Sequence, residues 1–150
     1  MEFPFKSAVV STLAHATEDE QKVLAAVRIL LPSEVEVKQT KLKGHHGNPI
    51  TSFEASVEQR KLLRELWQRV VEKLKTGKIE KIVGSLPEKV DETCHFYLRF
   101  DKQLAHAGEL ELTEGGDAIH LRMKVAAFPA KPEVAVELVR KFFTEVKGPV

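Results

Sequence analysis

The sequence predicts an α+β fold in which helices cover one face of a largely antiparallel sheet. Three observations lead to this prediction. Segments that alternate apolar and polar side chains recur along the chain, segments with apolar residues at helical spacing lie between them, and a glycine-flanked turn joins two of the predicted strands directly. The expected order is β-α-β-β-α-(α)-β-β-β-α, within one domain that covers residues 1–150.

The first half of the chain is expected to form three strands and two helices. Strands are predicted at residues 5–15, 34–43 and 50–57, from their β-branched and alternating residues. Thr17 and Glu20 have the spacing of a capping box, so a helix should begin at Thr17 and end before Pro32. The longest helix is predicted at residues 58–75, because its apolar residues recur at helical spacing.

The second half should supply two clearly alternating strands. In residues 93–101 and 119–128 every second side chain is apolar, which predicts strands with one buried face each. Further elements are a short amphipathic helix at residues 78–86, a connector at 101–107 and a short strand at 109–113. Pro129 and Pro132 bracket the entry to a last helix.

Composition limits the kinds of function. The chain has 150 residues, 43% hydrophobic and 30% charged, which is enough apolar content for a packed core. A net charge of +1 provides no overall field for a polyanion, so nucleic-acid binding would need cations gathered on one part of the surface. The single cysteine, Cys94, excludes an internal disulfide and favours a reducing, cytoplasmic location. Neither a membrane span nor a signal peptide is expected from the apolar runs.

A basic hairpin is the first candidate for binding. Lys38, Lys41 and Lys43 precede a Gly-His-His-Gly-Asn-Pro turn that carries His45 and His46. These cations could contact phosphates, while the glycines would let backbone N–H groups approach closely. The alternative is a solvated edge hairpin, whose lysines prevent pairing with another strand. Adjacent histidines rarely bind one metal ion and no cysteine or His-x-x-x-His spacing supports them, so no metal is expected.

The polar sides of the two late strands are the second candidate. The predicted outward residues are His95, Tyr97 and Arg99 on one strand and His120, Arg122 and Lys124 on the other. If both strands lie in one sheet, the tyrosine could stack on bases and the cations could contact phosphates. The alternative is the polar side that any half-exposed antiparallel sheet has. The lack of acids among the six residues favours the binding hypothesis.

The long predicted helix and the segment after it form a third basic group. Its cations are Arg60, Lys61, Arg64, Arg69, Lys73, Lys75, Lys78 and Lys81. They outnumber the nearby acids, and a basic helix face can lie along a phosphate backbone. A solvated helix face with pairs such as Glu65–Arg69 is the interpretation that we favour.

No catalytic signature is present in the sequence. It lacks a G-x-S-x-G segment, a P-loop and a glycine pattern for dinucleotides. Cys94 and His95 are neighbours on a predicted strand, so they point to opposite faces and cannot act as nucleophile and base. We therefore predict neither an enzyme nor a cofactor. A small-molecule enzyme that uses Asp101, Lys102 and the histidines is a third hypothesis, which requires a pocket where these groups converge.

Three segments of the chain together resemble a known family. They are HATEDE at residues 15–20, GHHGNPI at 44–50, and YLRFDKQ at 97–103 followed by Ala105 and Gly108-Glu109-Leu110. In this combination and order, the chain resembles the archaeal RNA-binding protein family described as a predicted exosome-associated subunit, from about Ser7 to Phe143. The resemblance implies RNA binding without enzymatic activity. It also implies an α+β fold similar to that of the large-subunit ribosomal protein that contacts 5S RNA.

The resemblance carries over residue by residue to three groups of positions. They are His15, Thr17, Glu18 and Asp19; Gly44, His45, His46, Gly47, Asn48 and Pro49; and Arg99, Phe100, Asp101, Lys102 and Gln103.

The sequence as a whole predicts a non-catalytic RNA-binding accessory protein of an exosome-linked RNA-processing assembly or a ribosome-linked one. The expected RNA-contacting residues are Lys38, Lys41, Lys43, His45, His46, Tyr97, Arg99, Lys102, Arg122 and Lys124. The expected partners are RNA and such a protein complex, with no membrane and no small-molecule substrate. The alternative is a protein–protein adaptor that docks through a sheet edge or a helix face. An exposed apolar patch would indicate it, with Phe128 and Phe143 as candidate residues.

Overall fold

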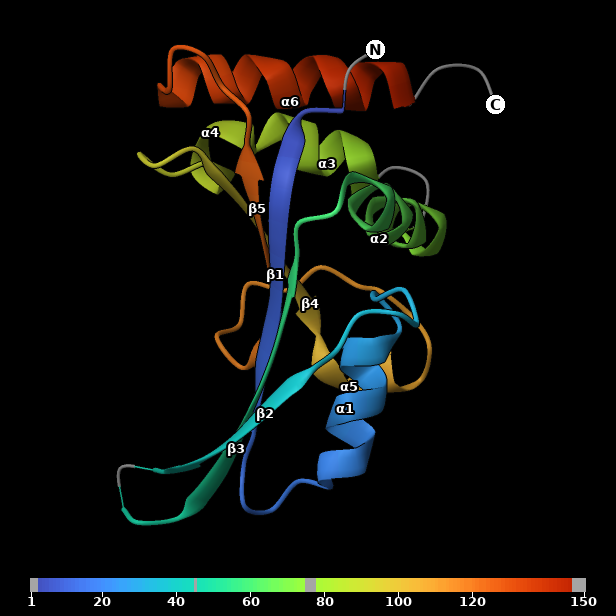
Figure 1. Cartoon of the computed structure of the whole chain (residues 1–150), viewed down its shortest axis with the longest axis vertical. Helices are drawn as coiled ribbons and strands as arrows, with labels where there is room; N and C mark the ends of the chain where they lie inside the picture. Colours follow the sequence, from blue (N-terminus) through green and yellow to red (C-terminus); the bar gives the residue numbers. More distant parts are fainter. Residues whose placement is uncertain (1–2, 45, 75–77, 147–150) are drawn as a thin grey trace.

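The computed structural model describes residues 3–44, 46–74 and 78–146, and these residues form a five-stranded antiparallel sheet (Figure 1). The strand order is β2-β3-β1-β5-β4, and every neighbouring pair is antiparallel. The strands are β1 (Phe5–Ala14), β2 (Lys38–Lys43), β3 (Pro49–Val57), β4 (His95–Asp101) and β5 (Ala118–Val125). This architecture confirms the predicted α+β class.

The helices build the core against one face of this sheet. They are α1 (Glu20–Arg28), α2 (Arg60–Lys73), α3 (Lys78–Gly84), α4 (Leu86–Lys89), α5 (Lys102–His106) and α6 (Pro132–Val146). In Figure 1, α1 and α5 lie side by side against the lower part of the sheet, and α6 crosses its upper end. None of the helices in the described part of the chain combines the length and the apolar character that a membrane span needs.

Aromatic packing joins α6 to the sheet. The Phe143 ring lies 5.8 Å from the Phe96 ring of β4 and 5.2 Å from the Trp67 ring of α2. Burying a phenylalanine side chain contributes roughly 1.5–3 kcal/mol. Phe143 is fully buried, so it belongs to the core and not to an exposed patch, whereas Phe128 is 95% exposed in the loop before α6.

The start of α1 differs from the prediction. Asp19 is the N-cap, because its side chain accepts a hydrogen bond from the backbone N–H of Gln21. The carboxylate of Glu18 accepts from the backbone N–H of His15 in a separate turn before the helix. Glu20 therefore does not reach back to Thr17 as a capping box would require, and its side chain is free to contact the sheet.

The segment between β4 and β5 also differs. Asp101 accepts a hydrogen bond from the backbone N–H of Leu104, which starts α5 where a connector was expected. The predicted strand at 109–113 is reduced to a single bridge between Leu112 and Phe100 at the free edge of β4. The extended character of this segment was therefore predicted correctly. Its pairing with β4 is shorter than expected.

The β2–β3 turn explains two of the glycines in the basic hairpin. Gly47 has a φ of +78°, a conformation that glycine adopts without strain. A Cβ atom at Gly44 would lie 2.8 Å from the Cδ1 atom of Ile50 and 3.1 Å from the backbone oxygen of Asn48. Gly44 is therefore needed for close approach, while Gly47 is needed for its positive φ.

Candidate nucleic-acid interface

The outer sides of β4 and β5 meet on the open face of the sheet, as the second sequence hypothesis required. Direct cross-strand partners are His95 with Lys124, Tyr97 with Arg122, and Arg99 with His120. Side chains opposite each other in an antiparallel pair lie close together. We call these six residues the β4–β5 basic face. Between them they place three fixed positive charges around one aromatic ring, on the side of the sheet opposite the core.

The open face extends from this patch to the other edge of the sheet. One row across the five strands consists of Lys38, Glu54, Ser11, His120 and Arg99. Since neighbouring strands lie about 4.8 Å apart, Lys38 is roughly 19 Å from Arg99. Glu54 is the direct cross-strand neighbour of Lys38. The basic charge of the open face is therefore concentrated at β4 and β5.

Asp91 fixes the tyrosine of the basic face. Its carboxylate accepts hydrogen bonds from the Tyr97 hydroxyl at 2.8 Å, from the backbone N–H of His95 at 2.9 Å and from both the backbone and the hydroxyl of Thr93. Burial works against the charge of Asp91, but the donors outweigh it, and the pKa of this carboxyl falls to about 2. The Tyr97 ring is thus held in place before any ligand binds.

The histidine beside this tyrosine does not add fixed charge. Burial lowers the pKa of His95, and the nearby Lys124 and Arg122 lower it further, against the opposing effect of Asp91. Burial and the hydrogen bond to Asp91 raise the pKa of Tyr97, so its hydroxyl stays protonated. The fixed charge of the basic face therefore resides on Arg99, Arg122 and Lys124.

The basic hairpin contributes less free charge than the sequence suggested. The ammonium group of Lys41 bonds to the carboxylate of Glu20 on α1 and to the hydroxyl of Thr51. The bonds from Lys41 and Thr51 lower the pKa of Glu20, and the contact neutralises the charge of Lys41. Lys43 and His46 are exposed, and His45 lies outside the described residues.

Lys102 has a structural position instead of an exposed one. Its side chain is 4% exposed, and its ammonium group bonds to the backbone oxygen of Leu13 at 2.8 Å, to Glu18 at 2.9 Å and to Asp117 at 2.7 Å. Three acceptors satisfy all three N–H groups, so none remains for a phosphate. The reason is tertiary: α5 carries Lys102 under the β1–α1 turn.

One histidine and two carboxylates near Lys102 have the spacing of a metal site. Ligand atoms of His15, Glu18 and Asp117 lie within 4.8 Å of one another. The ammonium group of Lys102 already bonds to Glu18 and Asp117 and occupies the space between these carboxylates. This group is therefore an ion-pair cluster that joins the end of β1, α5 and the start of β5.

The three segments that carry the family resemblance converge at this end of the sheet. One hollow of about 320 Å³ includes Thr17, Glu18 and Asp19 with Lys102 and Gln103 in its lining. A neighbouring hollow of about 210 Å³ is lined by His15 and Thr17 together with residues of the hairpin turn. Most of the polar contacts here are internal, and Asp101 caps α5. The residues named for the enzyme hypothesis therefore hold chain segments together.

The third basic group does not continue the basic face. Arg64 of α2 lies over the Phe3 ring, 5.2 Å from its centre, and Arg60 and Lys61 are exposed in the helix layer. Lys75 lies outside the described residues. Lys78 and Lys81 lie apart from the α2 cations: both line a cavity whose wall also includes Tyr97 and Arg99. This grouping and the roles of Asp91 and Lys89 were not predicted from the sequence, since none of these residues belongs to a local motif.

Comparison with known proteins identifies the family of this chain. Residues 7–125 match the model of a family described as RNA binding. The chain belongs to this RNA-binding family. The matched range runs from β1 to the end of β5, so it contains the β4–β5 basic face and all three resemblance segments. The predicted family membership is confirmed.

Relatives of this RNA-binding family member come from archaea. RNA-binding protein PAB1135 of Pyrococcus abyssi is 39% identical over 138 residues, which cover 89% of this chain and 90% of that protein. Protein AF2318 of Archaeglobus fulgidus has a solved structure with a TM-score of 0.83 and 34% identity, covering 91% of this chain and 98% of that one. The solved structure of Mth689 of Methanothermobacter thermautotrophicus has a TM-score of 0.78 and 37% identity, and the match covers 94% of this chain and 99% of that one. The similarity therefore extends over nearly the whole chain.

Proposed function

We propose that this protein binds RNA through the open face of its sheet, with the β4–β5 basic face as the centre of the interface. The observation that carries the proposal is the direct pairing of Tyr97 with Arg122, flanked by Lys124 and Arg99, on a face that the helices leave uncovered. Membership in the RNA-binding family and the similarity to RNA-binding protein PAB1135 of Pyrococcus abyssi support it. The protein acts without a cofactor and without catalysis.

The phosphate contacts differ from the set expected from the sequence. Arg99, Arg122 and Lys124 provide three of them, and Lys38 provides the fourth at the far edge of the sheet. His46 adds a contact for an RNA long enough to reach the hairpin turn. Lys43 is left out, because it lies on the same side of β2 as Lys41, away from the open face. Lys41 and Lys102 are excluded from the proposed interface, because carboxylates of the chain bind their ammonium groups.

Salt dependence tests this interface. Four phosphate contacts give a slope of about −3 in a plot of log affinity against log salt for single-stranded RNA, so affinity should fall about 50-fold between 50 and 200 mM salt. Fluorescence anisotropy with a labelled oligonucleotide measures this slope. An affinity that stays constant over this range would rule out a phosphate-based interface.

We further propose that the protein serves an RNA-processing assembly, exosome-linked or ribosome-linked, in the cytoplasm. The buried single cysteine is consistent with a reducing compartment. If the protein joins such an assembly through RNA, nuclease treatment before affinity purification should release it from the assembly. A matched sample with nuclease inhibitor is the control.

The exposed Phe128 supports a second candidate function, that of a protein–protein adaptor. Its side chain is 95% exposed, so an aromatic ring of the kind enriched in protein interfaces is available to a partner. The adaptor hypothesis makes the opposite prediction for the nuclease experiment: co-purification would survive nuclease treatment and would be lost in a Phe128→Ser variant. The two candidates are therefore distinguished by one purification.

A further inference from the structure

A cavity of about 510 Å³ lies against the free edge of β4, next to the basic face. Its walls come from α3 and α4 on one side and from residues 112–114 on the other. The edge of β4 is covered at one end by the bridge from Val90 to Phe96 and at the other by the bridge from Leu112 to Phe100. The cavity therefore occupies the uncovered stretch of edge between the two bridges.

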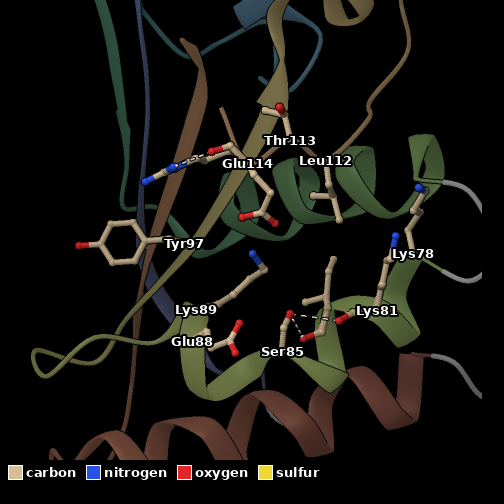
Figure 2. A pocket seen from close by; sticks show the side chains of 11 residues that line it. Lys78, Lys81, Ser85, Glu88, Lys89, Tyr97, Leu112, Thr113 and Glu114 are labelled. Carbon is tan, nitrogen blue, oxygen red and sulfur yellow. Dashed lines mark hydrogen bonds between the residues drawn. The ribbon is translucent and has the colours of Figure 1, made fainter. Parts of the chain in front are cut away.

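The cavity has two kinds of polar group above an apolar floor. The described residues that line it include four cations, Lys78, Lys81, Lys89 and Arg99, and two carboxylates, Glu88 and Glu114. Ile82 and Leu112 supply apolar surface. Figure 2 shows the side chains of Lys89 and Glu114 pointing toward each other across the cavity, with Lys81 on the α3 side. Lys78 pairs with Glu111 at 3.6 Å, and the remaining three cations outnumber the two acids by one, so the cavity favours an anion.

The two carboxylates narrow the choice of anion. A ligand made only of phosphates would be repelled by Glu88 and Glu114, so the cavity suits a ligand that also carries hydrogen-bond donors and an apolar surface. A nucleotide has all three features. Its phosphate can pair with Lys81 and Lys89, an N–H group on its base edge can donate to Glu114, and the flat base can cover Leu112. A cavity of about 510 Å³ is within the usual size range for a small ligand.

Tyr97 and Arg99 belong both to the cavity lining and to the basic face. In Figure 2 the Tyr97 ring lies at the rim and points away from the interior, toward the open face. An RNA strand on that face can therefore stack one base on Tyr97 and extend the next nucleotide into the cavity without leaving the protein surface. Asp91 holds the Tyr97 hydroxyl, which fixes the rim.

We propose that this cavity binds one unpaired nucleotide of the RNA that lies on the β4–β5 basic face. The inference rests on the proposed RNA-binding function and extends it to a class of RNA, namely single strands. A paired base stays stacked in its helix with its Watson–Crick edge bound to its partner, so a duplex cannot extend a base into the cavity. Single-stranded and looped RNA can do so.

The test measures the affinity of one double variant for two RNAs, a single strand and a duplex. A Lys81→Ala/Lys89→Ala double variant should bind a single-stranded decanucleotide about 10-fold more weakly than the wild type and should bind a blunt RNA duplex within twofold of it. Both lysines are at the surface, so the variant should fold normally. A Lys61→Ala/Lys141→Ala variant, which removes two exposed lysines elsewhere, is the charge-matched control. Equal losses for both RNAs, or equal losses in the control, would overturn the inference.

A second measurement separates this inference from the proposed function. Titration with adenosine and uridine 5′-monophosphates, followed by amide NMR spectra, should shift the signals of Ser85 and residues 112–114 in the wild type and not in the double variant. If the wild type binds no RNA but these signals shift, the proposed function fails and the nucleotide site stands. If the wild type binds RNA but monophosphates shift other amides only, the RNA interface stands and the nucleotide site is wrong.

Discussion

An Arg99→Ala/Arg122→Ala/Lys124→Ala variant should bind single-stranded RNA about 100-fold more weakly than the wild type at 0.1 M salt. Each phosphate contact releases about 0.7 of a counterion from a single strand, so three lost contacts remove about two powers of ten at this salt concentration. The slope of log affinity against log salt should become shallower, from about −3 to about −0.7. Anisotropy titrations at several salt concentrations measure both quantities.

The matched control for this variant removes three exposed cations from the helix layer. An Arg60→Ala/Lys61→Ala/Lys141→Ala variant has the same net charge as the triple variant but leaves the basic face intact. It should keep both the affinity and the slope, within twofold. If the control loses affinity while the basic-face variant does not, the RNA lies along α2 and the proposed interface is wrong.

Replacement of Lys102 by methionine should destabilise the protein by about 3 kcal/mol at pH 7. The change leaves the backbone oxygen of Leu13 and the carboxylate of Glu18 without their buried donor. Breaking a fully buried ion pair costs about 3–5 kcal/mol, and the 61% exposure of Asp117 lets water replace part of the loss. The midpoint of thermal unfolding should fall by roughly 6–12 °C, as measured by circular dichroism.

The pH dependence of this effect has a definite sign. The hydrogen bond from Lys102 lowers the pKa of Asp117, with burial acting against it. A carboxyl whose pKa is lowered by folding stabilises the native state above its unfolded pKa and loses this contribution as the pH falls through its folded pKa. The difference in stability between wild type and variant should therefore be complete at pH 7 and shrink below about pH 4, in urea titrations at both pH values.

A Lys22→Met variant, which alters an exposed lysine of α1, serves as the control and should change stability by less than about 0.5 kcal/mol. Lys102→Met should also keep the wild-type affinity for RNA when it is folded, because its ammonium group is not exposed. A stable Lys102→Met variant that loses RNA binding would return Lys102 to the interface and contradict the role in the cluster.

Local patterns were sufficient to predict most of the sheet. Side chains on a strand alternate between faces, so the sequence alone placed Phe96, Leu98 and Phe100 in the core and Tyr97 and Arg99 outside it. The hairpin turn was predictable for the same reason, because Gly47 needs a conformation that few other residues adopt. The family resemblance was also visible in the amino-acid sequence, as three short segments in a fixed order.

Only the tertiary structure decided which cations are available to a ligand. Lys41 and Lys102 are as basic in sequence as Lys124 and Arg122, but their acidic partners Glu20 and Glu18 come from distant parts of the chain. The cavity beside β4 likewise joins α3, α4 and residues 112–114, which no periodicity connects. The physical reason is that charge neutralisation and concave shape depend on distances in space, whereas alternation and turn formation depend on neighbours in sequence.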